Sequence, residues 1–290
     1  MVFEKYFNGN PNILGMKNTK LFKYIDSEES AYWLGFIVAD GNINKNGHSL
    51  HINLSRRDKS HLQKLSNLLK QPVKDTVWQK DGKFYNGCYL CLSSSECWND
   101  LYSLGVVPNK GVSDQSVILN NIPDDLKHHF LRGVFDGDGT VALPNPSNKN
   151  AYAVGFCGEK RMMLAISAYL REQLGIGDTL PSNPSDNFAV IRWVGKRQTE
   201  AICGFLYRDA SIFLDRKKNR YNRIKSKKGK GKFFGVTKTS SGKWNASIRH
   251  EGKRVHIGNY NLSEEAARAH DSFAIAAGKP AYKINFQEVI

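Results

Sequence analysis

The sequence predicts an α+β protein with two pseudo-symmetric αββαββα repeats packed through one helix each, and a small three-stranded sheet with one helix. Two apolar segments, WLGFIVADGNI at 33–43 and FLRGVFDGDGTV at 130–141, share an internal glycine and an Asp-Gly near their ends. The same order of alternating and helical apolar patterns comes after each segment. We therefore expect an N-terminal segment at 1–20, repeats at 21–118 and 119–224, a basic linker at 225–232 and a C-terminal module at 233–290.

Both repeated segments are predicted to be helices. Acidic and capping residues precede each apolar run, which indicates the start of a helix, and a glycine follows each run as a stop signal. Two small residues within each run stand four positions apart, so they line one helix face and let another helix backbone approach. The small residues are Gly35 and Ala39 in the first helix and Gly133 and Gly137 in the second, and the stops are Gly41 and Gly139.

Close packing of these helices would bring Asp40 and Asp138 together at their C-terminal ends. A carboxylate there lies at the negative end of a helix dipole and faces a second negative charge. Divalent cations relieve both effects, and two carboxylates with metal beside a phosphate make a hydrolytic site. A single Asp-Gly is an ordinary turn after a helix, but its occurrence twice in one repeated pattern favours a functional site.

The elements between and after the motifs are predicted from the spacing of apolar residues. Alternation indicates half-buried strands, and apolar residues three or four apart indicate helices. The first repeat has a strand at 50–55, a helix at 62–69, strands near 76–78 and 84–92, and a short helix before LYSLGVVPNKG. The second has a strand at 152–156, a helix at 162–174, a strand at 188–194 and then LYRDASIFLDRK.

One face of each predicted sheet is polar. A curved polar sheet face can lie along the major groove of DNA, although a solvated face would have the same pattern. The residues expected to contact DNA from these faces are Asn53, Arg56, Arg57, Lys83 and Arg192.

The two helical segments resemble the LAGLIDADG motif of homing endonucleases, in the single-chain form with two motifs. The copies read WLGFIVADG and LRGVFDGDG, and both keep the acidic eighth position, as Asp40 and Asp138. Position six, which is not the essential one in that family, is Val38 in the first copy and Asp136 in the second. The resemblance covers about residues 20–225.

This resemblance implies a hydrolase that cuts double-stranded DNA at a long asymmetric site and acts as a monomer without an obligate protein partner. It also implies that Asp40 and Asp138 bind Mg²⁺ or another divalent cation such as Mn²⁺. Lys110 ends LGVVPNK and Lys217 ends the matching FLDRK. In the resembled family a lysine at this point helps to polarise water or phosphate; the alternative is a surface lysine that contacts DNA phosphate.

Composition limits the class of protein. A net charge of +15 and a pI of about 9.5 imply a polyanionic partner, most simply nucleic acid, although ribosome or membrane-surface binding would give the same sign. No apolar run could span a bilayer, so no membrane contact is expected. Five cysteines without a signal peptide indicate reduced thiols and an intracellular protein, cytoplasmic, nucleoid-associated or organellar, rather than a secreted one.

The C-terminal module is predicted to have three short strands and one helix capped by Ser263. It resembles the plant APETALA/ethylene-response-factor DNA-binding domain through FGV, GKWNASIR, RVHIGNY, EEAARAHDSFAI and KINF. In that family the sheet enters the major groove, which implies a second DNA contact here. Strand alternation places Lys243, Ser247, Arg249, Arg254 and His256 on the outward face.

A protein that binds nucleic acid without cutting it is the alternative to an endonuclease. It would be an RNA maturase that assists intron splicing or a DNA-binding regulator. Both motif aspartates and both lysines are present, which favours the enzyme because a binder need not retain them.

Overall fold

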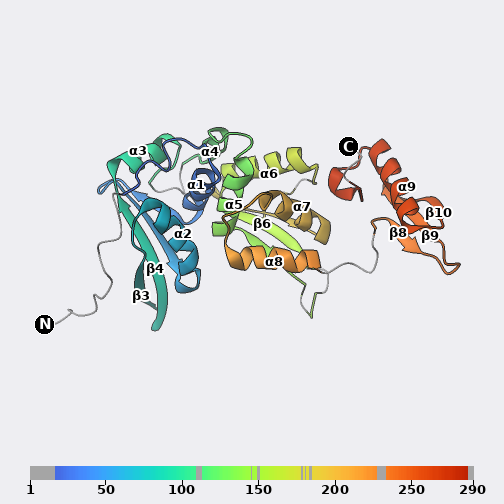
Figure 1. Ribbon diagram of the computed structural model, residues 1–290, viewed down its shortest axis with the longest axis horizontal. Coiled ribbons are helices and arrows are strands. Elements are labelled where there is room, and N and C mark those ends of the chain that lie inside the picture. The colour runs from blue at the N-terminus through green and yellow to red at the C-terminus, as the bar shows by residue number, and fades with distance from the viewer. Residues whose placement is uncertain are drawn as a thin grey trace. The chain divides into compact units, whose positions relative to one another are not determined.

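The structure is a computed structural model that describes residues 17–108, 113–144, 146–148, 151–177, 179, 181–182, 185–226 and 233–286. The chain divides into two compact units. The first consists of Met1–Gly137 and Ala210–Leu214, and the second of Asp138–Asp209 and Asp215–Ile290. Helices and sheets are mixed in both units, so the α+β class is confirmed (Figure 1). No helix in the described ranges is long and apolar enough to cross a bilayer.

The first unit has the predicted αββαββα order. Its strands form one antiparallel sheet in the order β1-β2-β4-β3. The elements are α1 (Glu28–Asp40), β1 (Gly41–Asn44), β2 (Ser49–Ser55), a 3-10 turn (Arg56–Asp58), α2 (Lys59–Leu69), β3 (Lys74–Lys80), β4 (Lys83–Ser93), α3 (Ser95–Ser103), α4 (Ser116–Asn120) and α5 (Lys127–Asp138), whose last residue falls in the second unit.

The two motif helices, α1 and α5, are buried on every side along their middle turns. Their glycines let the two backbones touch. A Cβ on Gly35 would collide with the carbonyl of Phe130, and a Cβ on Gly133 would collide with the carbonyl of Tyr32 and lie 2.7 Å from the amide nitrogen of Phe36. The predicted close packing of the two helices is therefore confirmed.

The glycine that comes after α1 has a different role from the one predicted. Gly41 has φ −81° and ψ 160°, which is extended backbone rather than the left-handed conformation of a helix stop. It is already the first residue of β1, and a Cβ there would lie 2.8 Å from the Cα of Ile37. The glycine is needed because the chain passes directly from helix to strand against the last helical turn. Gly139 also has no positive φ.

The second unit begins with the second repeat. It contains β5 (Thr140–Ala142), β6 (Ala153–Glu159), α6 (Lys160–Leu174), β7 (Phe188–Val194), α7 (Lys196–Leu206) and α8 (Asp215–Ser226), and its sheet has the order β5-β6-β7. Where the first repeat has a fourth strand, the described residues here show only an isolated bridge, in which the Ser182 amide donates to the Val190 carbonyl over 2.8 Å. Proline cannot donate to a ladder, and Pro181 and Pro184 flank this bridge in the sequence.

The C-terminal module has the expected pattern. It consists of β8 (Val236–Lys238), β9 (Trp244–His250), β10 (Lys253–Tyr260), α9 (Ser263–Ala276) and a 3-10 turn (Ala281–Lys283), with sheet order β10-β9-β8. Val236 and Ala246 of the sheet pack against Ala266 and Ala267 of α9, so small residues let the helix lie close to the strands.

The start of α9 corrects one expectation. Ser263 is the first helical residue rather than the cap; the N-cap is Leu262, whose amide donates to the Glu265 carboxylate over 3.3 Å. The glutamate replaces the serine as the capping acceptor.

The helix contact predicts the effect of one methyl group. Gly133→Ala should lower the free energy of unfolding by about 3 kcal/mol or more, because the new Cβ collides with rigid backbone rather than with a movable side chain. Gly204→Ala in α7 is the matched control, since its Cβ meets only the hydroxyl of Tyr221 at 3.3 Å; it should be neutral or slightly stabilising. Equal denaturant midpoints for the two variants would contradict the packing described above.

Candidate functional site

The C-terminal ends of α1 and α5 carry the two motif aspartates. Asp40 is the exposed last residue of α1, and Asp138 is the half-buried last residue of α5. A Cβ on Gly137 would touch Ala39 and lie 3.3 Å from Oδ2 of Asp40, so the Asp40 carboxylate lies against the residue that precedes Asp138 in the chain. Neither helix has a basic residue in its last turn. Each helix therefore ends in a carboxylate at its negative end, and no basic residue of its own last turn offsets that charge.

A pocket in the second unit continues from Asp138 over the outward face of the β5-β6-β7 sheet. The Cys157 thiol donates to the Asp138 carbonyl over 3.2 Å, which ties the end of α5 to β6. Arg192 is exposed on β7 directly opposite Gly155, and it lines the same pocket as Asp138. The pocket thus has a carboxylate and a guanidinium with apolar side chains among its other lining residues, which include Ala142, Phe188 and Val190.

The outward face of the first unit's sheet carries two of the predicted contact residues. Asn53 is exposed on β2 opposite Tyr89 of β4, and Lys83 is exposed on the same face of β4 because alternate residues of a strand share a face. An aromatic pair on this sheet was not predicted from the sequence. Trp78 and Tyr85 stack with ring centroids 6.0 Å apart and remain 44% and 41% exposed.

Two predicted arginines do not lie on the sheet. Arg56 and Arg57 occupy the 3-10 turn after β2, where the chain turns into α2. The predicted strand ends at Ser55, as β2 does, but the two residues that follow it turn away from the sheet instead of continuing its face. Both side chains are exposed beside the sheet rather than on it.

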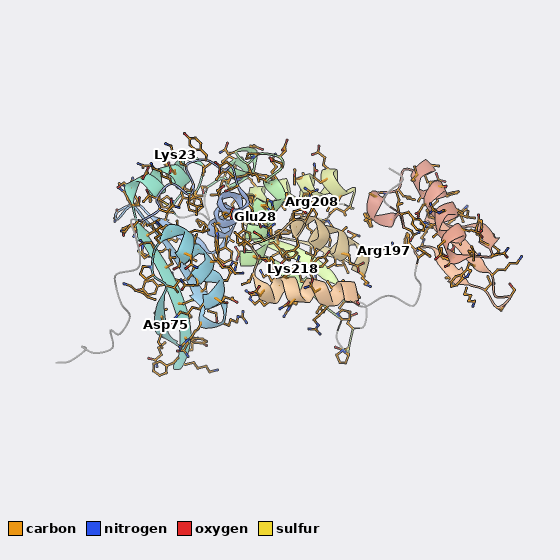
Figure 2. All side chains as sticks on the ribbon, viewed as in Figure 1. Lys23, Glu28, Asp75, Arg197, Arg208 and Lys218 are labelled. Carbon is orange, nitrogen blue, oxygen red and sulfur yellow. The ribbon has the colours of Figure 1, made fainter. Side chains whose placement is uncertain are left out.

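Only one of the two predicted catalytic lysines can be placed, since Lys110 lies outside the described residues. Lys217 is in the first turn of α8 and is 4% exposed. Its neighbours on this basic helix are held by the second unit. Arg220 donates to the Val141 carbonyl over 2.9 Å. Lys218, which Figure 2 labels on α8, lies 4.6 Å from the ring centre of Tyr207.

The outward basic residues of the C-terminal module lie on or next to two strands: Arg249 is on β9, Arg254 and His256 are on β10, and Lys243 directly precedes β9. Lys243, Arg249, Arg254 and His256 are exposed. Ser247, also predicted to face outward, is only 7% exposed because Arg254 covers it, donating to its hydroxyl over 3.1 and 3.0 Å. The serine holds the arginine rather than facing solvent itself.

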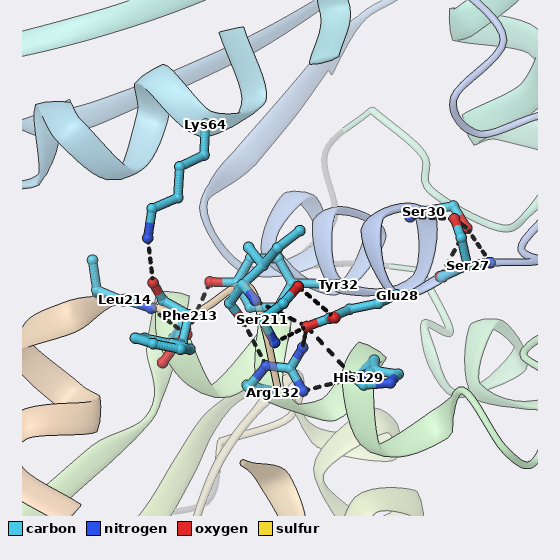
Figure 3. A network of polar contacts seen from close by, with 12 residues as sticks. Ser27, Glu28, Ser30, Tyr32, Lys64, His129, Arg132, Ser211, Phe213 and Leu214 are labelled. Carbon is cyan, nitrogen blue, oxygen red and sulfur yellow. Dashed lines mark hydrogen bonds and ion pairs between the residues drawn. The ribbon is translucent and has the colours of Figure 1, made fainter. Parts of the chain in front are cut away.

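A buried polar network in the first unit was not predicted (Figure 3). Glu28, at the start of α1, accepts from Arg132 of α5 over 2.5 Å and from the amides of Ser211 and Ile212 over 2.8 and 2.9 Å. Arg132 is fully buried and also bonds His129 over 2.8 Å. The signal in the sequence was a charged arginine within the apolar run FLRGVF, and it does not reveal the partners of that arginine.

The network changes the titration of Glu28. Burial raises the pKa of its carboxyl, but the amides of Ile212 and Ser211, the Ser211 hydroxyl and the Arg132 charge together outweigh burial and leave the pKa below its usual range. The folded state therefore stabilises the ionised carboxylate of Glu28.

Comparison with solved structures identifies the fold. The homing endonuclease I-WcaI bound to its DNA recognition sequence matches with a TM-score of 0.52 at 12% sequence identity, over 72% of this chain and 95% of that chain. The LAGLIDADG homing endonuclease I-GzeII in complex with its DNA target matches with a TM-score of 0.45 at 12% identity, over 67% and 89% of the two chains. By its match to I-WcaI, the chain has the homing endonuclease fold, as its two motifs predicted.

Sequence comparison finds a partial relative of another kind. The ethylene-responsive transcription factor ERN3 of Medicago truncatula is 37% identical over 70 residues, which cover 23% of this chain and 29% of that protein. The match thus spans less than a third of the length of the transcription factor. No protein family model matches the chain.

The titration of Glu28 predicts an acid dependence of stability. Since its pKa is lower in the folded state, its contribution is fully present above the unfolded value of about 4.3 and is lost as the pH falls through the folded value. Between about pH 5 and pH 3 the wild type should lose more free energy of unfolding than Glu28→Gln, which has no charge to titrate there. Parallel curves from urea unfolding at each pH would contradict this role.

Proposed function

We propose that the protein is a DNA endonuclease that hydrolyses both strands at a long asymmetric site. The observation that carries this proposal is the pair of motif helices, which are in backbone contact and each end in an aspartate that leads into a sheet with an exposed, partly basic face. The homing endonuclease fold supports it. The sheets would contact the DNA while the helix ends act on the backbone between the two half-sites.

Asp40 and Asp138 would hold Mg²⁺ or Mn²⁺. The donor set fits such an ion, because Mg²⁺ in phosphate-processing sites is usually bound by one or two carboxylates together with substrate phosphates and water. In the described ranges no group of three or more His, Cys, Asp or Glu could form a metal site made by the protein alone, so the phosphates would have to complete the shell. A bound divalent ion supplies an activated water and charge stabilisation of the leaving oxygen.

The rest of the chemistry would come from residues of the chain. Lys217 would place a positive charge near the scissile phosphate, where it stabilises the negative charge that develops during hydrolysis. Arg192 and Asn53 would contact the DNA from the sheet faces. The net charge of +15 favours association with a polyanion. Because both motifs are in one chain, a monomer would act on two unlike half-sites.

The C-terminal module would provide a second DNA contact. Its exposed residues Lys243, Arg249, Arg254 and His256 lie on one sheet face, and the similarity to the transcription factor ERN3 supports this use. A tethered second contact raises affinity through effective concentration.

The first prediction from this proposal concerns the carboxylates. Asp40→Asn and Asp138→Asn should each reduce double-strand cleavage by more than about a hundredfold, since even the partners of metal ligands contribute 10–100-fold. Binding measured in Ca²⁺ should remain. Suitable substrates are plasmids selected for binding from a library of randomised sites. Asp124→Asn, which removes an exposed carboxylate before α5, is the control and should cut normally. Cleavage at the wild-type rate by either motif variant would contradict the proposed chemistry. A wild-type protein that binds DNA but never cuts it would favour a maturase or regulator.

A second prediction concerns the module. A chain that ends at Ser226 should still cut the site, but it should need more protein or less salt. Its binding should also fall less steeply with salt concentration than that of the full chain, because it makes fewer phosphate contacts. The measurement is the slope of log affinity against log salt for both chains. A truncated chain that folds and binds but does not cut at any concentration would show that the module is part of the cleavage machinery.

A further inference from the structure

The segment Ala210–Leu214 lies within the second repeat in the sequence, between α7 and α8, but packs in the first unit. We call it the anchored segment. Side chains from three helices of that unit bind its backbone. Glu28 of α1 accepts from the amides of Ser211 and Ile212, and Arg132 of α5 donates to the Ile212 carbonyl over 2.8 Å.

Two further contacts fix the end of the anchored segment. The amide of Leu214 donates to Oδ2 of Asp136 over 2.7 Å, and Lys64 of α2 donates to the carbonyl of Phe213 over 3.1 Å. Asp136 also accepts from the Tyr32 hydroxyl over 2.9 Å. Each residue from Ser211 to Leu214 thus has a backbone group that is hydrogen-bonded to a side chain (Figure 3).

Stability alone would not require charged side chains at these buried positions. Arg132 and Asp136 are both fully buried, and burying a charge is costly unless it is paired and hydrogen-bonded. Apolar side chains of similar volume could fill the same space at no loss of stability. The charged groups add directional hydrogen bonds, which determine the backbone path of the anchored segment.

The path of this backbone determines where the next helix starts. α8 begins at Asp215, immediately after Leu214, and Lys217 is its third residue. Lys217 follows Leu214 by three positions, so the hydrogen bonds of the anchored segment act on the chain directly before this lysine.

We infer that Glu28, Arg132 and Asp136 are positioning residues that set Lys217 for DNA cleavage by holding the anchored segment. The inference rests on the proposed function, since it assigns these residues to that reaction. Position six of the second motif, Asp136, thereby has a task that Val38 in the first motif cannot perform.

Glu28 offers the cleanest test because it is remote from the aspartates. Glu28 and Asp40 stand at opposite ends of α1, about 18 Å apart along the helix axis at 1.5 Å per residue. A Glu28 variant therefore cannot alter metal binding at Asp40 by direct contact. Its effect on cleavage would have to pass through the anchored segment.

The experiment compares Glu28→Ala with two matched variants of the full chain. Ser27→Ala removes the N-cap of the same helix, which bonds the Ser30 amide over 3.3 Å, and leaves the bonds from Glu28 to the anchored segment in place. Glu28→Gln retains an acceptor for the Ser211 and Ile212 amides. With DNA already bound and metal then added, Glu28→Ala should cleave at least about tenfold more slowly, since small misplacements of a catalytic group can cost a hundredfold. DNA affinity should be unchanged, and the two matched variants should cleave within about threefold of the wild type.

A second readout does not depend on cleavage. Acetylation of Lys217 by acetic anhydride, followed by mass spectrometry, reports how closely the buried lysine is held, with exposed Lys243 as the internal reference. Glu28→Ala should raise the rate at Lys217 several-fold, and Ser27→Ala should not. If Glu28→Ala fails to fold, Ser211→Ala replaces it, because that change removes only the hydroxyl that donates to Glu28 over 2.7 Å.

Lys217→Met provides the last arm. If Glu28 acts through Lys217, Glu28→Ala should cost little further cleavage in the Lys217→Met background, since residues that act as a unit are not additive. Full additivity, or equal Lys217 acetylation in wild type and Glu28→Ala, overturns the inference. A wild type that never cuts DNA would refute the proposed function instead, and the acetylation result would still decide whether the segment holds Lys217.

Discussion

The backbone contact between α1 and α5 is the constraint on which the rest of the structure depends. Neither Gly35 nor Gly133 can carry a Cβ, because each would strike a carbonyl of the opposite helix. The same approach places the Asp40 carboxylate against Gly137, the residue before Asp138. A looser helix pair would bury the same apolar residues but would not bring the end of one helix onto the end of the other. Glycine is therefore required here for the site as well as for the packing.

Most of the fold could be predicted because it depends on short-range patterns. Alternation gave β7 its bounds at Phe188 and Val194, and the spacing of small residues predicted the helix contact. Individual hydrogen bonds between side chains and backbone groups far apart along the chain could not be predicted. Asp136 bonds Leu214, which is 78 residues away, and Arg132 bonds Ile212 across 80 residues. Local rules also failed where a side chain is covered by a neighbour, as Arg254 covers Ser247, or where residues after a strand enter a turn, as Arg56 does.

The candidate site, too, could be predicted only in part. The repeat predicted Asp40 and Asp138 as site residues, which stays a prediction, and Asn53, Lys83 and Arg192 are exposed on the strands where they were expected. Lys217 was predicted from the segment FLDRK and the family resemblance, and its catalytic role stays a prediction; its burial in the first turn of α8, directly after the anchored segment, was not predicted. A charged residue within an apolar run, such as Arg132 in FLRGVF, therefore forms contacts with parts of this chain that are distant in sequence.

Joint binding of a metal ion by Asp40 and Asp138 is the step on which the proposed DNA hydrolysis depends. Anomalous scattering from Mn²⁺ in crystals of the protein with its selected DNA tests this step most directly. We expect anomalous peaks at about 2.0–2.2 Å from carboxylate oxygens of both aspartates, with DNA phosphate oxygens completing the shell. Peaks that lie on neither aspartate, or on one of them alone, would contradict it.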